Sequence, residues 1–181
     1  MRVIAGSARG IVLAAPRSRG TRPITDRLKE TVFGILADRV IAARVLDLYA
    51  GSGAIGIEAL SRGAASCCFV EHGREALLTL RRNVERARLE AGAEVIGGEV
   101  SSFLSSFSGE PFDLVFVDPP FAEPAILGPL ERLVPHLAPS AIVVVRRFWR
   151  SGLPRVAGLV PRRERRLGET VVTFLEAEAG Q

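Results

Sequence analysis

The amino-acid sequence predicts an α/β fold in which a mostly parallel β-sheet is covered by helices on both faces. Strand-like and helix-like segments alternate from residue 44 onward, and the strand-like segments are almost wholly apolar, as in sheets buried on both faces. A glycine-rich turn joins the first of these strands to its helix. The chain has 181 residues, of which 48% are hydrophobic, so it can form one domain with a substantial core.

A hairpin and a helix are predicted in the N-terminal part of the chain. Residues 2–5 and 11–14 are short strand-like runs joined through glycines, which predicts a small hairpin. Thr25 or Asp26 can then cap a helix whose apolar residues fall on one face. We interpret residues 1–40 as an extension, made of this hairpin and helix, that packs on a core domain of residues 41–181.

The core domain is expected to follow a repeated β-α order. Strands are predicted at residues 44–49, 66–71, 94–96, 113–117 and 140–145, helices at 54–61, 74–90, 101–107 and 124–137, and an edge strand at 169–176. In such sheets ligands bind at the carboxyl ends of the strands. Candidate functional residues are therefore sought at those ends.

Composition limits the classes of protein. No segment approaches the roughly 20 apolar residues of a membrane span, and none has a signal-peptide core, so we expect a cytoplasmic protein without a membrane partner. The chain has only two histidines and two cysteines, and Cys67 and Cys68 are adjacent. Neither a disulfide framework nor a metal site is expected.

The glycine turn predicts a nucleotide-type cofactor. Gly51, Gly53 and Gly56 have the spacing of the dinucleotide fingerprint, and they follow a predicted strand and precede a predicted helix. Asp47 would repel a pyrophosphate but suits the ammonium group of S-adenosylmethionine, unless it only caps the turn. Glu71 ends the second strand, where an acidic residue accepts the ribose hydroxyls of either S-adenosylmethionine or NAD.

A second segment points to the acceptor of the reaction. Asp118-Pro119-Pro120-Phe121 follows an apolar strand, and the two prolines remove backbone donors and stiffen the chain. The carboxylate and the carbonyl oxygens that remain suit the exocyclic amine of a flat base, and the ring of Phe121 can stack on that base. Such a site would work by positioning and electrostatics, without a covalent intermediate.

With these motifs the sequence resembles the bacterial RsmD-like family, which methylates a guanine N2 of 16S ribosomal RNA. The resemblance covers nearly the whole chain and rests on residues 22–33, 47–64, 69–71 and 118–121. It implies a Rossmann-like class I S-adenosylmethionine-dependent methyltransferase fold, with a mostly parallel seven-stranded sheet and a small N-terminal β-hairpin extension. It also implies a monomer that acts on 16S rRNA within a small-subunit particle.

The motifs and the resemblance together give the expected site residues. The catalytic residues expected are Asp118, Pro119, Pro120 and Phe121, and the cofactor-binding residues expected are Asp47, Ala50, Gly51, Ser52, Gly53, Glu71, His72 and Glu99. Glu99 stands where relatives carry an aspartate, Arg146 where they often carry a glutamate, and Leu167-Gly168-Glu169-Thr170 replaces a tyrosine-containing motif. His72 either borders the cofactor or is a loop residue without a role.

Positive charge is concentrated near both ends of the chain. Residues 1–30 hold seven basic side chains, and residues 146–166 hold eight arginines against Glu164 alone. Either this is ordinary solvated surface or it faces a polyanion. We expect RNA contacts from an N-terminal group and from a group after the fifth strand: Arg2, Arg9, Arg17, Arg19, Arg22, Arg146, Arg147 and Arg150.

Three other functions are considered. An adenine-N6 methyltransferase on DNA or RNA would share the chemistry, although no large target-recognition region is visible. A nucleotide-dependent oxidoreductase is disfavoured by Asp47, and an RNA-binding protein without activity would not require the Asp118 turn.

Overall fold

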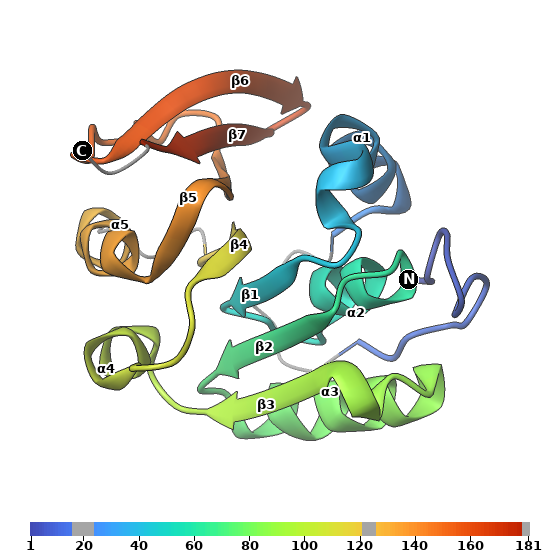
Figure 1. The fold of residues 1–181 in the computed structure, drawn as a ribbon. Helices are drawn as coiled ribbons and strands as arrows, with labels where there is room; N and C mark the ends of the chain where they lie inside the picture. The colour runs from blue at the N-terminus through green and yellow to red at the C-terminus, as the bar shows by residue number, and fades with distance from the viewer. Residues whose placement is uncertain (16–23, 121–125, 179–181) are drawn as a thin grey trace.

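A computed structural model of the chain describes residues 1–15, 24–120 and 126–178, and these form a seven-stranded sheet with helices on both faces (Figure 1). The strand order is β3-β2-β1-β4-β5-β7-β6. The first five strands in this order run parallel to one another, whereas β7 runs antiparallel to both β5 and β6. The strands are β1 (Arg44–Leu48), β2 (Ser66–Glu71), β3 (Ala93–Gly97), β4 (Phe112–Val117), β5 (Leu137–Phe148), β6 (Leu159–Leu167) and β7 (Thr170–Ala177).

The helices divide between the two faces of the sheet. Helices α1, α2 and α3 cover one face and contribute to one apolar cluster, and α4 and α5 cover the other face and contribute to a second. The α-helices are α1 (Asp26–Leu36), α2 (Ala54–Ser61), α3 (Arg74–Ala87), α4 (Val100–Ser106) and α5 (Leu127–Leu133), and short 3₁₀ turns lie at Ala37–Val40, Glu90–Gly92 and Val134–His136. The predicted fold class is confirmed.

The crossover in strand order determines where a ligand can bind. β1 lies between β2 and β4, and Leu48 at its carboxyl end is level with Val117 of β4 and Val70 of β2. The connections that leave these three strands therefore meet at one edge of the sheet, at its topological switch point. We call this the carboxyl edge.

Two predicted elements differ from the structure, and one strand of the structure was not predicted. The N-terminal hairpin is reduced to a single bridge between Arg2 and Val12, because the backbone N–H groups of Ile4 and Ala5 donate to Glu58 instead of to the second run. β6 was not predicted, since its run of arginines hides the alternation of a strand. Residues 169–176 were predicted as an edge strand, but β7 is internal because β6 pairs with its outer side.

The N-terminal segment is fixed to the core by a buried carboxylate. Glu58 of α2 accepts the backbone N–H groups of Ile4 (2.8 Å) and Ala5 (3.1 Å), and Lys29 lies 3.2 Å from the same carboxylate with no exposed surface. The Lys29 ammonium also donates to the carbonyl of Arg2. Buried charges of this kind are stable only when fully paired, so the segment, α1 and α2 form one interlocked unit.

The start of α1 agrees with the sequence. Thr25 is its N-cap, and its hydroxyl accepts the Leu28 N–H at 3.2 Å. No helix among the described residues is long and apolar enough to span a membrane.

Candidate active site

The glycine turn between β1 and α2 uses each glycine for a different purpose. Gly51 has a φ of +56°, and a Cβ there would meet no atom of the described residues closer than 3.9 Å, so these residues leave open space above it. A Cβ on Gly53 would come within 2.1 Å of Leu80, and one on Gly56 within 2.3 Å of the Phe69 ring. Gly53 therefore allows close packing against α3, Gly56 allows close packing of α2 against β2, and Gly51 leaves room for a ligand.

Glu71 holds two backbone turns together at the carboxyl edge. Its Oε2 accepts the Gly51 N–H at 2.8 Å and its Oε1 accepts the Gly73 N–H at 2.6 Å. The side chain is 10% exposed, so it borders solvent next to the open space at Gly51. His72 is largely exposed, with its Nδ1 3.6 Å from Glu71 Oε1. Glu99 is also exposed and precedes α4 at the same edge.

Asp47 lies beneath the turn rather than in it. Its carboxylate is buried and accepts the Gly56 N–H at 3.0 Å. Burial raises the pKa of the Asp47 carboxyl well above its usual value, although the Gly56 hydrogen bond lowers it. Stabilising the turn is thus one role of this side chain, and a contact with a cofactor ammonium stays a prediction.

Asn83 supports the turn from α3, and sequence reasoning missed it. Its side-chain amide donates to the carbonyl oxygens of Ser52 (2.9 Å) and Ala14 (3.0 Å), and its Oδ1 accepts the Ala14 N–H at 2.8 Å. The side chain is almost completely buried. The sequence feature that could have indicated this role is a polar residue on the core face of an amphipathic helix, because a buried amide requires hydrogen-bond partners.

Asp118 follows β4 directly and is paired with Arg146 of β5. Arg146 Nη1 lies 2.8 Å from Asp118 Oδ2, and the two side chains are 8% and 19% exposed. Burial raises the pKa of the Asp118 carboxyl, and the charge and the hydrogen bond of Arg146 act in the opposite direction. Pro119 is buried and Pro120 is half-buried. The arginine therefore orients this carboxylate and favours its ionised form.

An apolar pocket adjoins this ion pair. Asp118 and Arg146 line it together with apolar side chains of α1, the start of α2, β4, β5 and β7, including Phe33 and Phe116. The pocket connects the Asp118 site with the segment before α1, since Ile24 lines it as well.

The predicted RNA-binding arginines that the structure describes do not form one group. Arg146 faces Asp118, and Arg147 is 13% exposed and pairs with Glu164 at 2.7 Å. Arg150 is exposed, with its guanidinium 4.7 Å from the centre of the Trp149 ring.

At the N-terminal end, Arg2 pairs with Asp26 at 3.3 Å. Arg9 lies in a turn packed against Ser61, where α2 ends away from the carboxyl edge. Arg17, Arg19, Arg22 and Phe121 lie outside the described residues. Within the described ranges no cluster of histidine, cysteine and carboxylate side chains could hold a metal ion.

The fold and the site define a class of protein. A seven-stranded sheet of this order, with a glycine turn and an acidic residue ending β2, is the fold of class I methyltransferases. A putative RNA methyltransferase from Pyrococcus horikoshii shares the fold at a TM-score of 0.73 and 19% identity, over 92% of this chain and 94% of that one.

Comparison with known proteins gives the family. The family described as Conserved hypothetical protein 95 matches residues 1–176. Ribosomal RNA small subunit methyltransferase D of Escherichia coli K12 is 39% identical over 99% of this chain and 91% of its own length. The putative rRNA methyltransferase YlbH of Bacillus subtilis is 34% identical over 96% of this chain and 97% of its own.

A solved structure agrees with these relatives. The putative methyltransferase yhhF from Escherichia coli superposes with a TM-score of 0.87 at 38% identity, covering 99% of both chains. The chain therefore belongs to the RsmD family.

Proposed function

We propose that this protein transfers a methyl group from S-adenosylmethionine to the exocyclic N2 amine of a guanine in 16S rRNA, the family's target being guanine 966. The names of its relatives support methylation of small-subunit rRNA. The observation that carries the chemistry is the adjacency of β1 and β4, because it brings the Gly51 turn and the Asp118 turn together at the carboxyl edge.

The residues around the Gly51 turn fit S-adenosylmethionine. The open space above Gly51 admits a ligand close to the backbone, and Glu71, between Gly51 and Gly73, can exchange backbone N–H groups for ribose hydroxyls. The other residues proposed to surround the cofactor are Asp47, Ala50, Ser52, Gly53, His72 and Glu99. When bound, the cofactor supplies an electrophilic methyl group on its sulfonium sulfur.

Asp118 is proposed to act on the acceptor amine. The lone pair of an aromatic amine is delocalised into the ring, so the amine is a poor nucleophile. Hydrogen bonds from the amine to the Asp118 carboxylate and to the Pro119 carbonyl would hold the nitrogen and favour a pyramidal geometry. The nitrogen gains the methyl group and loses one proton, and the adjacent carboxylate is suited to accept that proton.

Arg146 is proposed to be a positioning residue for this step. Its ion pair at 2.8 Å orients Asp118 and keeps it ionised next to an apolar pocket. This role differs from the RNA contact expected from the sequence.

The substrate is proposed to be RNA in which the target base is unpaired or flipped out, because a stacked base cannot enter a site at a strand end. We further propose that the enzyme acts as a monomer on a small-subunit particle.

The test uses radiolabelled S-adenosylmethionine with small-subunit particles from cells that lack the modification, and large-subunit particles as the control. We expect label in the small-subunit rRNA alone. Tight NADH binding without S-adenosylmethionine binding would overturn the proposal in favour of an oxidoreductase. RNA binding without label would indicate a protein that only binds RNA.

A further inference from the structure

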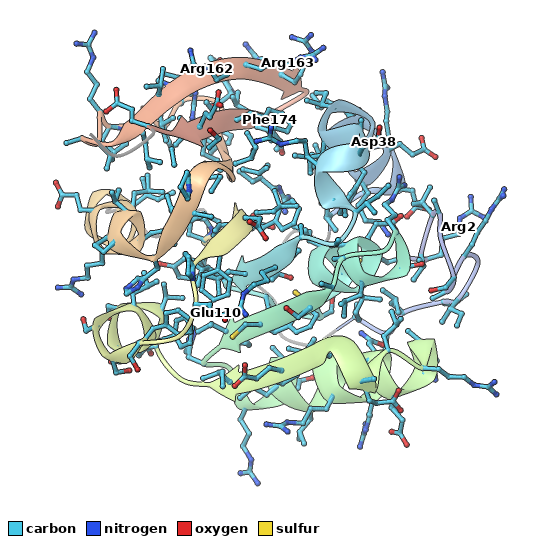
Figure 2. The ribbon with its side chains drawn as sticks, in the orientation of Figure 1. Arg2, Asp38, Glu110, Arg162, Arg163 and Phe174 are labelled. Atoms are coloured by element: carbon cyan, nitrogen blue, oxygen red, sulfur yellow. The ribbon has the colours of Figure 1, made fainter. Side chains whose placement is uncertain are left out.

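The outermost strand of the sheet carries a concentration of positive charge. β6 has nine residues, four of them arginines, and Glu164 is its one acidic residue. All four arginines are exposed, and Figure 2 labels Arg162 and Arg163 at the outer edge of the sheet. None of these four arginines is among the RNA-binding residues predicted from the sequence.

The register with β7 shows which face two of these arginines share. Arg163 pairs with Phe174, and Arg165 pairs with Val172. Cross-strand partners point to the same face of a sheet. Phe174 and Val172 belong to the same apolar cluster as Phe116, so Arg163 and Arg165 lie on the Asp118 side of the sheet. We call these two residues the β6 arginine pair.

The same register places this pair close to the reaction site. Arg165 is level with Val172, which in turn is level with Arg146, the partner of Asp118. Three strand spacings separate β4 from β6, so the two strands lie about 14 Å apart. Phosphates next to a base held at Asp118 would therefore lie near this strand.

A second group of cations lies at the same end of the sheet. The guanidinium of Arg166 lies 4.3 Å from the centre of the Trp149 ring, and that of Arg150 lies 4.7 Å from it. Trp149 directly follows β5, so it belongs to the carboxyl edge. Cation–π contacts hold both guanidinium groups over the indole while leaving them able to donate hydrogen bonds. We call these three residues the Trp149 cluster.

The β6 arginine pair differs from other arginines of β5 and β6 in having no carboxylate partner among the described residues. Arg147 and Arg162 are each paired with a carboxylate, Glu164 and Glu176 respectively. Within the described residues, no ion pair involves Arg163 or Arg165. Their charge is therefore available to an external anion.

We propose that the β6 arginine pair and the Trp149 cluster bind the phosphates of the RNA that flank the target nucleotide. This proposal rests on the proposed function and adds to it the surface that holds the substrate. Phosphate contacts of this kind fix the position and orientation of the nucleic acid, whereas the base itself is recognised at Asp118. The competing interpretation is that the arginines only protect an edge strand from pairing with another chain.

The test measures the affinity of the protein for small-subunit rRNA at several salt concentrations. The variants are Arg163→Gln with Arg165→Gln, and separately Arg150→Gln with Arg166→Gln. The matched control is Arg82→Gln with Arg132→Gln, which removes two exposed charges from α3 and α5. Affinity for S-adenosylmethionine, measured on the same samples, shows that each variant is folded.

Each variant pair should weaken RNA binding and flatten the plot of log affinity against log salt by about 1.4, which is about 0.7 for each contact with single-stranded RNA. The control pair should leave the slope within about half a unit of the unmodified protein. If the unmodified protein transfers methyl groups to RNA but the variants have the same RNA affinity and salt slope as the control, this inference is overturned and the proposed function stands. If the unmodified protein transfers no methyl group to RNA, the proposed function fails whatever the variants do.

Discussion

The two halves of the candidate site are built in different ways. On the cofactor side, backbone N–H groups of the turns donate to the carboxylates of Glu71 and Asp47. On the acceptor side, Asp118 is held by Arg146, a side chain 28 positions away on another strand. The carboxylates of the first half are thus held by main-chain donors, whereas the carboxylate of the second is held by a side-chain cation.

This difference predicts how each half responds to substitution. Changes on the cofactor side should alter cofactor affinity, because the contacts there hold the ligand. Changes on the acceptor side should alter the rate of transfer and its pH dependence, because they act on the amine and on the carboxylate that receives its hydrogen bond.

The largest effect is expected for Asp118→Ala. Loss of a hydrogen bond to the reacting amine should lower the rate of methyl transfer by about a hundredfold or more, with the affinity for S-adenosylmethionine nearly unchanged. Single-turnover kinetics and calorimetry measure the two quantities. Asp38→Ala, which removes an exposed carboxylate from the turn after α1, is the control. Near-normal turnover of Asp118→Ala would remove this residue from the reaction.

Glu71→Ala should have the complementary effect. Loss of charged hydrogen bonds to the ribose is expected to cost about 1.5–3 kcal/mol of binding free energy, or about 10- to 150-fold in affinity for S-adenosylmethionine. Calorimetric titration tests this, with the exposed Glu85→Ala on α3 as the control. Equal affinities of Glu71→Ala and the control would show that the carboxylate only closes the turn.

Arg146→Met should shift the pH dependence of transfer. Asp118 must be ionised to accept the amine hydrogen bond, so the rate falls as the pH drops through its pKa, which burial already raises. Removing the arginine takes away the charge that lowers this pKa, so the acid limb should move to higher pH by about one unit or more. An unchanged acid limb in a folded variant would show that Arg146 does not act through Asp118.

Asn83→Ala should have the smallest effect on the reaction itself. The substitution leaves backbone groups of Ala14 and Ser52 without their side-chain partner, which should cost about 1–3 kcal/mol of stability. The melting temperature should fall by about 2–4 °C for each kcal/mol lost. Arg82→Ala, at the preceding and exposed residue of the same helix, should leave the melting temperature within about 1 °C of that of the unmodified protein. A melting temperature equal to that of this control would contradict the supporting role of Asn83.

The contrast also explains what the sequence could predict. The strands and helices around the glycine turn follow from apolar runs and from glycines, so α2 and β2 have the predicted bounds. Contacts between distant strands leave no such local pattern. The Asp118–Arg146 pair, the tie from Asn83 to the Gly51 turn and the placement of β6 outside β7 became evident only from the structure.

The most direct test of the proposed reaction is the identity of the methylated nucleoside. Small-subunit particles that lack the modification are incubated with the protein and S-adenosylmethionine, and the 16S rRNA is digested and analysed by mass spectrometry. We expect N2-methylguanosine at one position, and a far lower yield of it from Asp118→Ala in the same time. N6-methyladenosine in place of N2-methylguanosine, or an equal yield from Asp118→Ala, would contradict the reaction proposed for this site.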